Sequence, residues 1–111
     1  MKNAIRLLLI ILFLSINCRA QNAVNIRGQV QYYNISYNQY YTLPNAIVDL
    51  YVPTPSGYRF LSQTITNGYG LYFFYHLLPG NYLIQINRAK NYQIQVFYPN
   101  SDFLDIPICF Y

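Results

Sequence analysis

A chain of 111 residues, of which 54% are hydrophobic, 19% aromatic and only 9% charged, has room for one small domain. The formal net charge is +4, but Lys2, Arg6 and Arg19 lie within the first twenty positions, and the rest of the chain holds four basic residues against three Asp. A protein that binds nucleic acid needs clustered cations. Composition therefore argues against a multi-domain enzyme and against nucleic acid as a partner.

The first twenty residues have the pattern of a cleaved secretory signal peptide. Lys2 and Arg6 precede ten largely apolar residues, 7–16, and Cys18-Arg19-Ala20 places small residues at both specificity positions of a signal-peptidase site. Ten residues span about 15 Å as a helix, half of a hydrocarbon core, so no stable transmembrane span is expected. We predict a signal peptide over 1–20 and a secreted, periplasmic or cell-envelope location.

The two cysteines bear on processing and on disulfides. In an alternative, lipoprotein-type route, Cys18 would become the first residue and carry lipid, but that route requires a small residue just before the cysteine, where Asn17 stands. The sequence does not decide whether Cys18 is lipidated. Loss of Cys18 with the signal leaves Cys109 without a disulfide partner. Cys109 lies in an alternating run, which favours a buried or half-buried thiol over a nucleophile.

From Gln21 onward, apolar residues alternate with period two and lack helical spacing, which predicts one all-β domain over residues 21–111. Two sheets packed face to face would bury the apolar sets of both, so the expected fold is a seven-stranded β-sandwich. Pro, Gly and Asn mark the turns between strands. The seven expected strands are 25–33, 46–52, 59–66, 71–75, 82–87, 92–98 and 103–110.

The last expected strand, 103–110, contains Pro107. Because proline cannot donate a hydrogen bond to a ladder, this C-terminal strand is expected at a sheet edge. An edge with few charges invites pairing with another chain. Self-association through the C-terminal edge strand is therefore a candidate interaction.

Residues 66–86 carry the most specific pattern, T-x-x-x-G-x-Y-x-F-x-x-L-x-P-G-x-Y-x-I-x-I. Upstream, residues 26–30 read I-x-G-x-V and residues 43–50 read L-P-x-A-x-V-x-L. Together these motifs resemble the carboxypeptidase regulatory-like domain, a transthyretin-like (prealbumin-like, Ig-like Greek-key) β-sandwich of bacterial envelope proteins that is related to Cna-B-type modules. The resemblance covers residues 24–111 and implies a non-catalytic accessory module.

Several residues of these motifs also have a structural explanation that does not depend on the resemblance. Gly28 in mid-strand indicates a bulge or the close approach of another backbone, and Gly70 suits a position with positive φ. Pro79-Gly80 predicts a turn, and Tyr82 just beyond it is placed to form a tyrosine corner. Relatives of this family form isopeptide crosslinks from a Lys or bind calcium through carboxylates. Arg27 and Asn67 stand at the corresponding positions, so neither feature is expected.

The sequence contains few residues that could form an active site. Hydroxyisourate hydrolases and intradiol dioxygenases, enzymes of similar fold, need more than one His, and this chain has only His76. His76 and Cys109 together fall short of a zinc site, and no G-x-S-x-G elbow is present. Asp102 and Asp105 are three apart, on opposite faces of a strand, and are expected as solvated turn residues. We predict no enzyme, no cofactor, no metal site and a solvent-facing His76.

The chain contains 14 Tyr, and five of them lie among Asn and Gln in the loop from Tyr32 to Tyr41. Aromatic rings with polar tips suit protein interfaces or carbohydrate stacking. An AT-rich codon bias would give the same composition without a function. The candidate ligand-binding residues of this loop are Tyr33, Tyr37 and Tyr40.

Two functions follow as expectations. The leading one is a non-catalytic, secreted or envelope-associated β-sandwich module for protein assembly or adhesion. The alternative is a small glycan-binding protein that uses the loop from Tyr32 to Tyr41. The partner is accordingly expected to be an envelope protein, a glycan or another copy of the chain.

Overall fold

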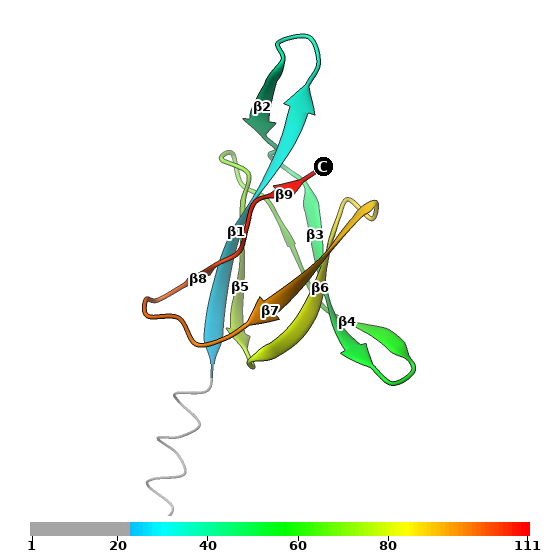
Figure 1. Ribbon diagram of the computed structural model, residues 1–111, viewed down its shortest axis with the longest axis vertical. Coiled ribbons are helices and arrows are strands. Elements are labelled where there is room, and N and C mark those ends of the chain that lie inside the picture. The colour runs from blue at the N-terminus through cyan, green and yellow to red at the C-terminus, as the bar shows by residue number, and fades with distance from the viewer. Residues whose placement is uncertain (1–22) are drawn as a thin grey trace, which may run out of the picture.

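The computed structural model describes residues 23–111, and this part of the chain is all-β, with nine strands in two sheets and no helix (Figure 1). The predicted signal peptide, 1–20, lies outside the described residues. The first sheet comprises β1 (Val24–Asn34), β2 (Gln39–Thr42), β5 (Leu71–Leu77), β8 (Leu104–Asp105) and β9 (Cys109–Phe110). The second comprises β3 (Ile47–Thr54), β4 (Gly57–Ile65), β6 (Gly80–Ile86) and β7 (Lys90–Val96).

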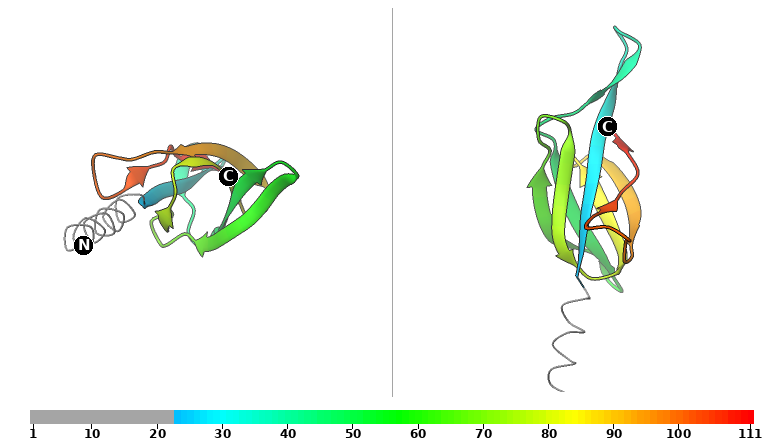
Figure 2. Two further views of the ribbon diagram at one scale, coloured as in Figure 1. Left: turned by 90° about the horizontal axis from the view of Figure 1, so that it is seen from below. Right: turned by 90° about the vertical axis from the view of Figure 1, so that its left-hand side faces the viewer.

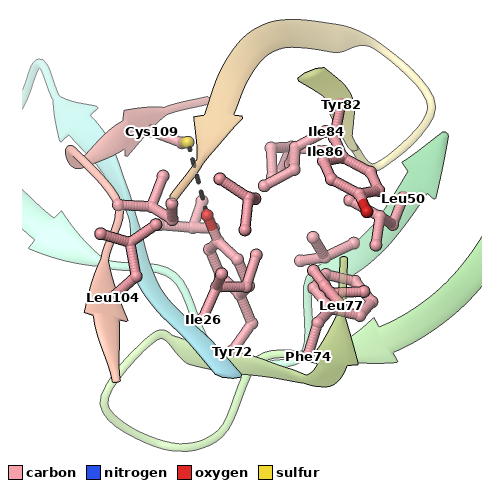
Figure 3. Close-up of a cluster of buried hydrophobic side chains, with 14 of the residues drawn as sticks. Ile26, Leu50, Tyr72, Phe74, Leu77, Tyr82, Ile84, Ile86, Leu104 and Cys109 are labelled. Atoms are coloured by element: carbon pink, nitrogen blue, oxygen red, sulfur yellow. Dashed lines mark hydrogen bonds between the residues drawn. The ribbon is translucent and has the colours of Figure 1, made fainter. Parts of the chain in front are cut away.

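The two sheets face one another, as the view along the long axis shows (Figure 2), and they enclose one hydrophobic core. In β1, Val24, Ile26 and Val30 are buried and alternate with residues that are partly exposed. From the other strands, the core receives among others Tyr72 and Ile84 (Figure 3). The period-two alternation in the sequence thus has its cause in one buried face per sheet, and the all-β sandwich prediction is confirmed.

The described residues hold nine strands rather than the expected seven, and the difference arises in two places. The first strand continues to Asn34, and the chain then folds back into β2, which pairs with it. The stretch 103–110 forms only β8 and β9, two residues each, because the segment with Pro107 lies between them. Both short strands run parallel to β1, so this segment lies at an edge of the first sheet.

The T-x-x-x-G motif forms the connection between β4 and β5. Thr66 is buried, donates its hydroxyl to the carbonyl of Leu43 at 2.7 Å, and accepts from the amide of Ala46 at 2.8 Å. The side-chain oxygen of Asn67 accepts from the amides of two turn residues, at 2.9 and 3.1 Å. Gly70 has a φ of 71°, as predicted. These side chains fix the turn that brings β5 back beside β1.

The predicted tyrosine corner is confirmed, because the buried Tyr82 donates its hydroxyl to the carbonyl of Leu78 at 2.6 Å. The expectation for Gly28 needs a correction. β1 pairs regularly with β5 at Gly28, and the register shift lies between Val24 and Ile26 instead. What approaches Gly28 is the ring of Tyr72 and not another backbone.

Candidate binding surface on the tyrosine arm

The end of β1 and the whole of β2 form a two-stranded hairpin that projects beyond the sandwich (Figure 1). We call residues 31–42 the tyrosine arm. Its turn is held by Asn34, whose side-chain oxygen accepts from the amides of Ser36 and Tyr37, and Asn38 in the turn has a φ of 55°. The alternation of β1 therefore continues out of the core into solvent, where its aromatic residues have no sheet to pack against.

One face of the arm carries Tyr33 and Tyr40, and Phe110 of the adjacent β9 packs beside them. Tyr33 and Tyr40 are cross-strand partners with ring centroids 5.0 Å apart, and Phe110 of β9 packs against Tyr40 at 5.1 Å. The hydroxyl of Tyr33 also contacts the side chain of Asn38. Tyr33 is 44% exposed, Tyr40 58% and Phe110 43%. We call these three residues the arm cluster.

The opposite face carries the remaining tyrosines of the arm. Tyr32 and Tyr41 are cross-strand partners with ring centroids 6.1 Å apart, and Tyr37 lies 6.3 Å from Tyr41. The structure therefore divides the three predicted ligand-binding residues. Tyr33 and Tyr40 come together, whereas Tyr37, 70% exposed, belongs to the other face.

Phe110 is a surface residue that the sequence interpretation missed. Hydrogen bonds to the backbone of Phe110 fix its position. Its amide donates to the hydroxyl of Tyr92 at 3.0 Å, and that hydroxyl donates to the carbonyl of Phe110. The amide of Tyr111 donates to the carbonyl of Gln31. Only the parallel pairing of β9 with β1 brings the C-terminus to the arm, and no local pattern in the sequence signals that pairing.

The arm combines aromatic rings with neutral polar groups. Its twelve residues include no charged side chain and consist of Tyr, amides, hydroxyls and one Ile. The ring planes in the arm cluster meet at 63° for Tyr33 and Tyr40 and at 56° for Tyr40 and Phe110. The first pair is edge to face and the second is tilted, so the three rings form a ridged apolar surface and not one flat platform.

The other residues considered for chemistry are dispersed over the fold. His76 is exposed at the end of β5, as predicted, and its amide donates to the side chain of Asn25. Asp102 is exposed in a loop. Asp105 is exposed in β8 but accepts two hydrogen bonds from the guanidinium of Arg27, at 2.7 and 3.2 Å, an ion pair that the sequence interpretation missed. The Arg27 guanidinium lowers the pKa of the Asp105 carboxyl.

Cys109 is a buried free thiol, as predicted. Its Sγ lies 3.8 Å from the hydroxyl of Tyr72, and burial raises the pKa of the thiol. Within residues 23–111, no three His, Cys, Asp or Glu side chains gather closely enough to hold a metal ion. The same part of the chain contains no helix that is long and apolar enough to cross a membrane.

Comparison with known proteins found no matching protein-family model and no match among curated proteins.

Proposed function

We propose that the chain is a secreted or envelope-associated, non-catalytic β-sandwich module that serves protein assembly or adhesion, with the tyrosine arm as its docking element. The resemblance of residues 66–86 to the carboxypeptidase regulatory-like domain supports the transthyretin-like assignment. The buried Thr66 and the tyrosine corner of Tyr82 give this motif a structural role. The proposal assigns no catalytic role to any residue of this motif.

The arm cluster carries the proposal. Tyr40 packs against both Tyr33 and Phe110, yet all three rings remain about half exposed, two of them on a hairpin that projects from the body and the third on β9 beside it. Aromatic residues with partial exposure are enriched in protein interfaces and supply much of their binding energy. Since the arm has no charge, the partner surface that fits it is an apolar groove with hydrogen-bonding groups at its rim.

The tilt of the rings favours a protein over a polysaccharide as the partner of the arm. A sugar chain that packs flat on several aromatic rings at once needs those rings close to one plane, whereas the planes in the arm cluster meet at 63° and 56°. A ridge of this kind suits a groove between side chains of another protein. Glycan binding by Tyr33, Tyr37 and Tyr40 remains the alternative that the experiment separates.

The test is a crosslinking pull-down of the tagged chain from fractionated native envelopes. We expect a stoichiometric protein partner, and we expect Tyr33→Ala combined with Tyr40→Ala to reduce its capture by about tenfold or more. Tyr69→Ala is the matched control, because Tyr69 is 75% exposed and lies outside the arm. Melting temperatures of all variants establish that the fold is kept.

Two results would contradict this function. Undiminished capture by the arm variant would remove the arm as the docking element. Retention on the polysaccharide fraction that depends on Tyr33, Tyr37 and Tyr40, with no protein partner, would replace protein docking by glycan binding at the arm.

A further inference from the structure

The second sheet divides into two hairpins at one end. Pairing between β3 and β6 stops at Tyr51 opposite Leu83. Beyond that point β3 stays paired with β4 as far as Gly57, and β6 stays paired with β7 as far as Val96. The β3–β4 and β6–β7 hairpins therefore diverge, and in Figure 1 the turn between β3 and β4 lies away from β6.

The divergence leaves a cleft of about 430 Å³ in the surface, which we call the hairpin cleft. Pro53 and Tyr58 line it from the β3–β4 hairpin, and Asn81, Gln93 and Gln95 line it from the β6–β7 hairpin. Small-molecule sites typically measure about 300–1,000 Å³. The cleft is therefore large enough for a ligand of one or two rings.

The β6–β7 hairpin contributes three amide side chains to the cleft, and Tyr82 and Ile94 complete its lining on that side. Asn81 and Gln95 are direct cross-strand partners, so their side chains stand side by side on the same face of the sheet. Gln93 donates to the hydroxyl of Tyr58 across the cleft at 3.4 Å. Within residues 23–111, no side-chain hydrogen bond engages the amide groups of Asn81 or Gln95, which leaves both available to a ligand.

The opposite wall is aromatic. Tyr58 is half exposed, and its ring lines the cleft. Pro53, its cross-strand partner, adds a rigid apolar surface beside the ring. A ring beside amide groups offers one apolar face and several hydrogen-bonding groups to the same ligand.

The lining contains no charged residue. An ionic ligand would lose hydration there without gaining a counter-charge, which disfavours phosphates, carboxylates and ammonium groups. An amide both donates and accepts hydrogen bonds, and so does a sugar hydroxyl. A neutral sugar also has an apolar C–H face that can pack on an aromatic ring. We propose that the hairpin cleft binds a neutral oligosaccharide, with Tyr58 as the stacking residue and Asn81 and Gln95 as the hydroxyl-binding residues.

This proposal is independent of the tyrosine arm, which lies on the other sheet. It is tested by titrating the chain with four neutral hexasaccharides, maltohexaose, cellohexaose, mannohexaose and chitohexaose, and with the charged hexagalacturonate. Calorimetry gives the affinity, and NMR follows the side-chain amide signals. We expect at least one neutral hexasaccharide to bind and to shift the signals of Asn81 and Gln95, and hexagalacturonate not to bind.

Variants of Tyr58 separate stacking from other contributions. Tyr58→Ala should weaken binding by about tenfold or more, whereas Tyr58→Phe, which keeps the ring, should bind within about threefold of the original chain. Tyr69→Ala serves again as the exposed control outside the cleft and should bind unchanged.

The proposal is overturned if none of the four neutral hexasaccharides binds, if hexagalacturonate binds as tightly as they do, or if Tyr58→Ala has no effect. It is also overturned if Tyr33→Ala with Tyr40→Ala abolishes binding instead, since that result places the glycan on the arm. Capture of a protein partner by the arm can succeed or fail without changing any of these outcomes.

Discussion

The ring of Tyr72 occupies the space that a side chain at Gly28 would need. The two residues are antiparallel partners in β5 and β1, and a Cβ atom built on Gly28 would lie 2.2 Å from Cζ of Tyr72. Tyr72 is completely buried and reaches across the core toward Cys109 (Figure 3). The absence of a side chain at Gly28 therefore leaves room for Tyr72, the largest fully buried side chain of the core.

Gly28→Ala should destabilise the domain, because neither the strand backbone nor the packed ring can move aside without disturbing other contacts. Overpacking of this kind costs about 1–3 kcal/mol in the free energy of unfolding. Urea denaturation measures the loss. Because Tyr72→Leu removes the ring, the double variant with Gly28→Ala should lose less stability than the two single variants added together. Strict additivity would mean that Tyr72 does not cause the conflict.

Tyr82→Phe should remove the hydrogen bond of the tyrosine corner while keeping the ring in the core. The hydroxyl donates to the carbonyl of Leu78 at 2.6 Å, and loss of one such bond costs about 0.5–1.5 kcal/mol. Tyr75→Phe is the control, since Tyr75 is in β5, the preceding strand of the chain, and is exposed. Urea denaturation should separate the two variants, and equal stabilities would show that the corner contributes nothing.

The sequence patterns predicted the structural features that depend on residues close together in the chain. Alternation revealed the buried faces of strands such as β1 and β6, and turn residues such as Gly70 and Pro79 marked where strands end. The tyrosine corner followed from the spacing of Tyr82 after its turn. All of these features are set by backbone geometry over a few residues.

Features that depend on pairing between strands far apart in the sequence could not be predicted from these patterns. Arg27 and Asp105 are 78 positions apart and meet only because β8 lies beside β1. Asp49 alternates outward in β3, yet it is buried and accepts a hydrogen bond from Gln63 at 2.7 Å. The hairpin cleft arises where pairing between β3 and β6 stops, although the alternation of both strands continues. Each of these features is a property of the assembled sheet.

The ion pair between Arg27 and Asp105 predicts a specific dependence of stability on pH. The guanidinium lowers the pKa of Asp105 in the folded state, so in acid the unfolded chain takes up the proton first. The stabilising effect is therefore present above the unfolded pKa of about 3.9 and is lost as the pH falls through the folded value. Both side chains are largely exposed, so salt should weaken the effect.

The measurement compares melting temperatures of the original chain and Asp105→Asn between pH 7 and pH 2. The variant should melt at a lower temperature at pH 7, and the two curves should converge in acid. Asp102→Asn makes the same change of charge in a loop and controls for net charge. A difference between the original chain and Asp105→Asn that persists unchanged at pH 2 would contradict an electrostatic origin.

The thiol of Cys109 should be protected from alkylation by the fold. It is 2% exposed, and burial raises the pKa of the thiol, so the thiolate that reacts is both inaccessible and scarce. In a Cys18→Ser background, where Cys109 is the one thiol, iodoacetamide at pH 8 should react at least about a hundredfold more slowly with the folded chain than with the urea-unfolded chain. Reaction in the folded chain then requires an opening that costs a few kcal/mol.

A neighbouring position supplies the control for this experiment. Ile108 is 43% exposed, so Ile108→Cys combined with Cys109→Ser moves the thiol by one residue, to the outward side of the same segment. That thiol should react at nearly the rate of the unfolded chain. If the two folded variants react equally fast, the C-terminal segment opens readily and β9 does not seal the core. If only Cys109 is slow, β9 keeps the thiol in the core and holds Phe110 against the tyrosine arm.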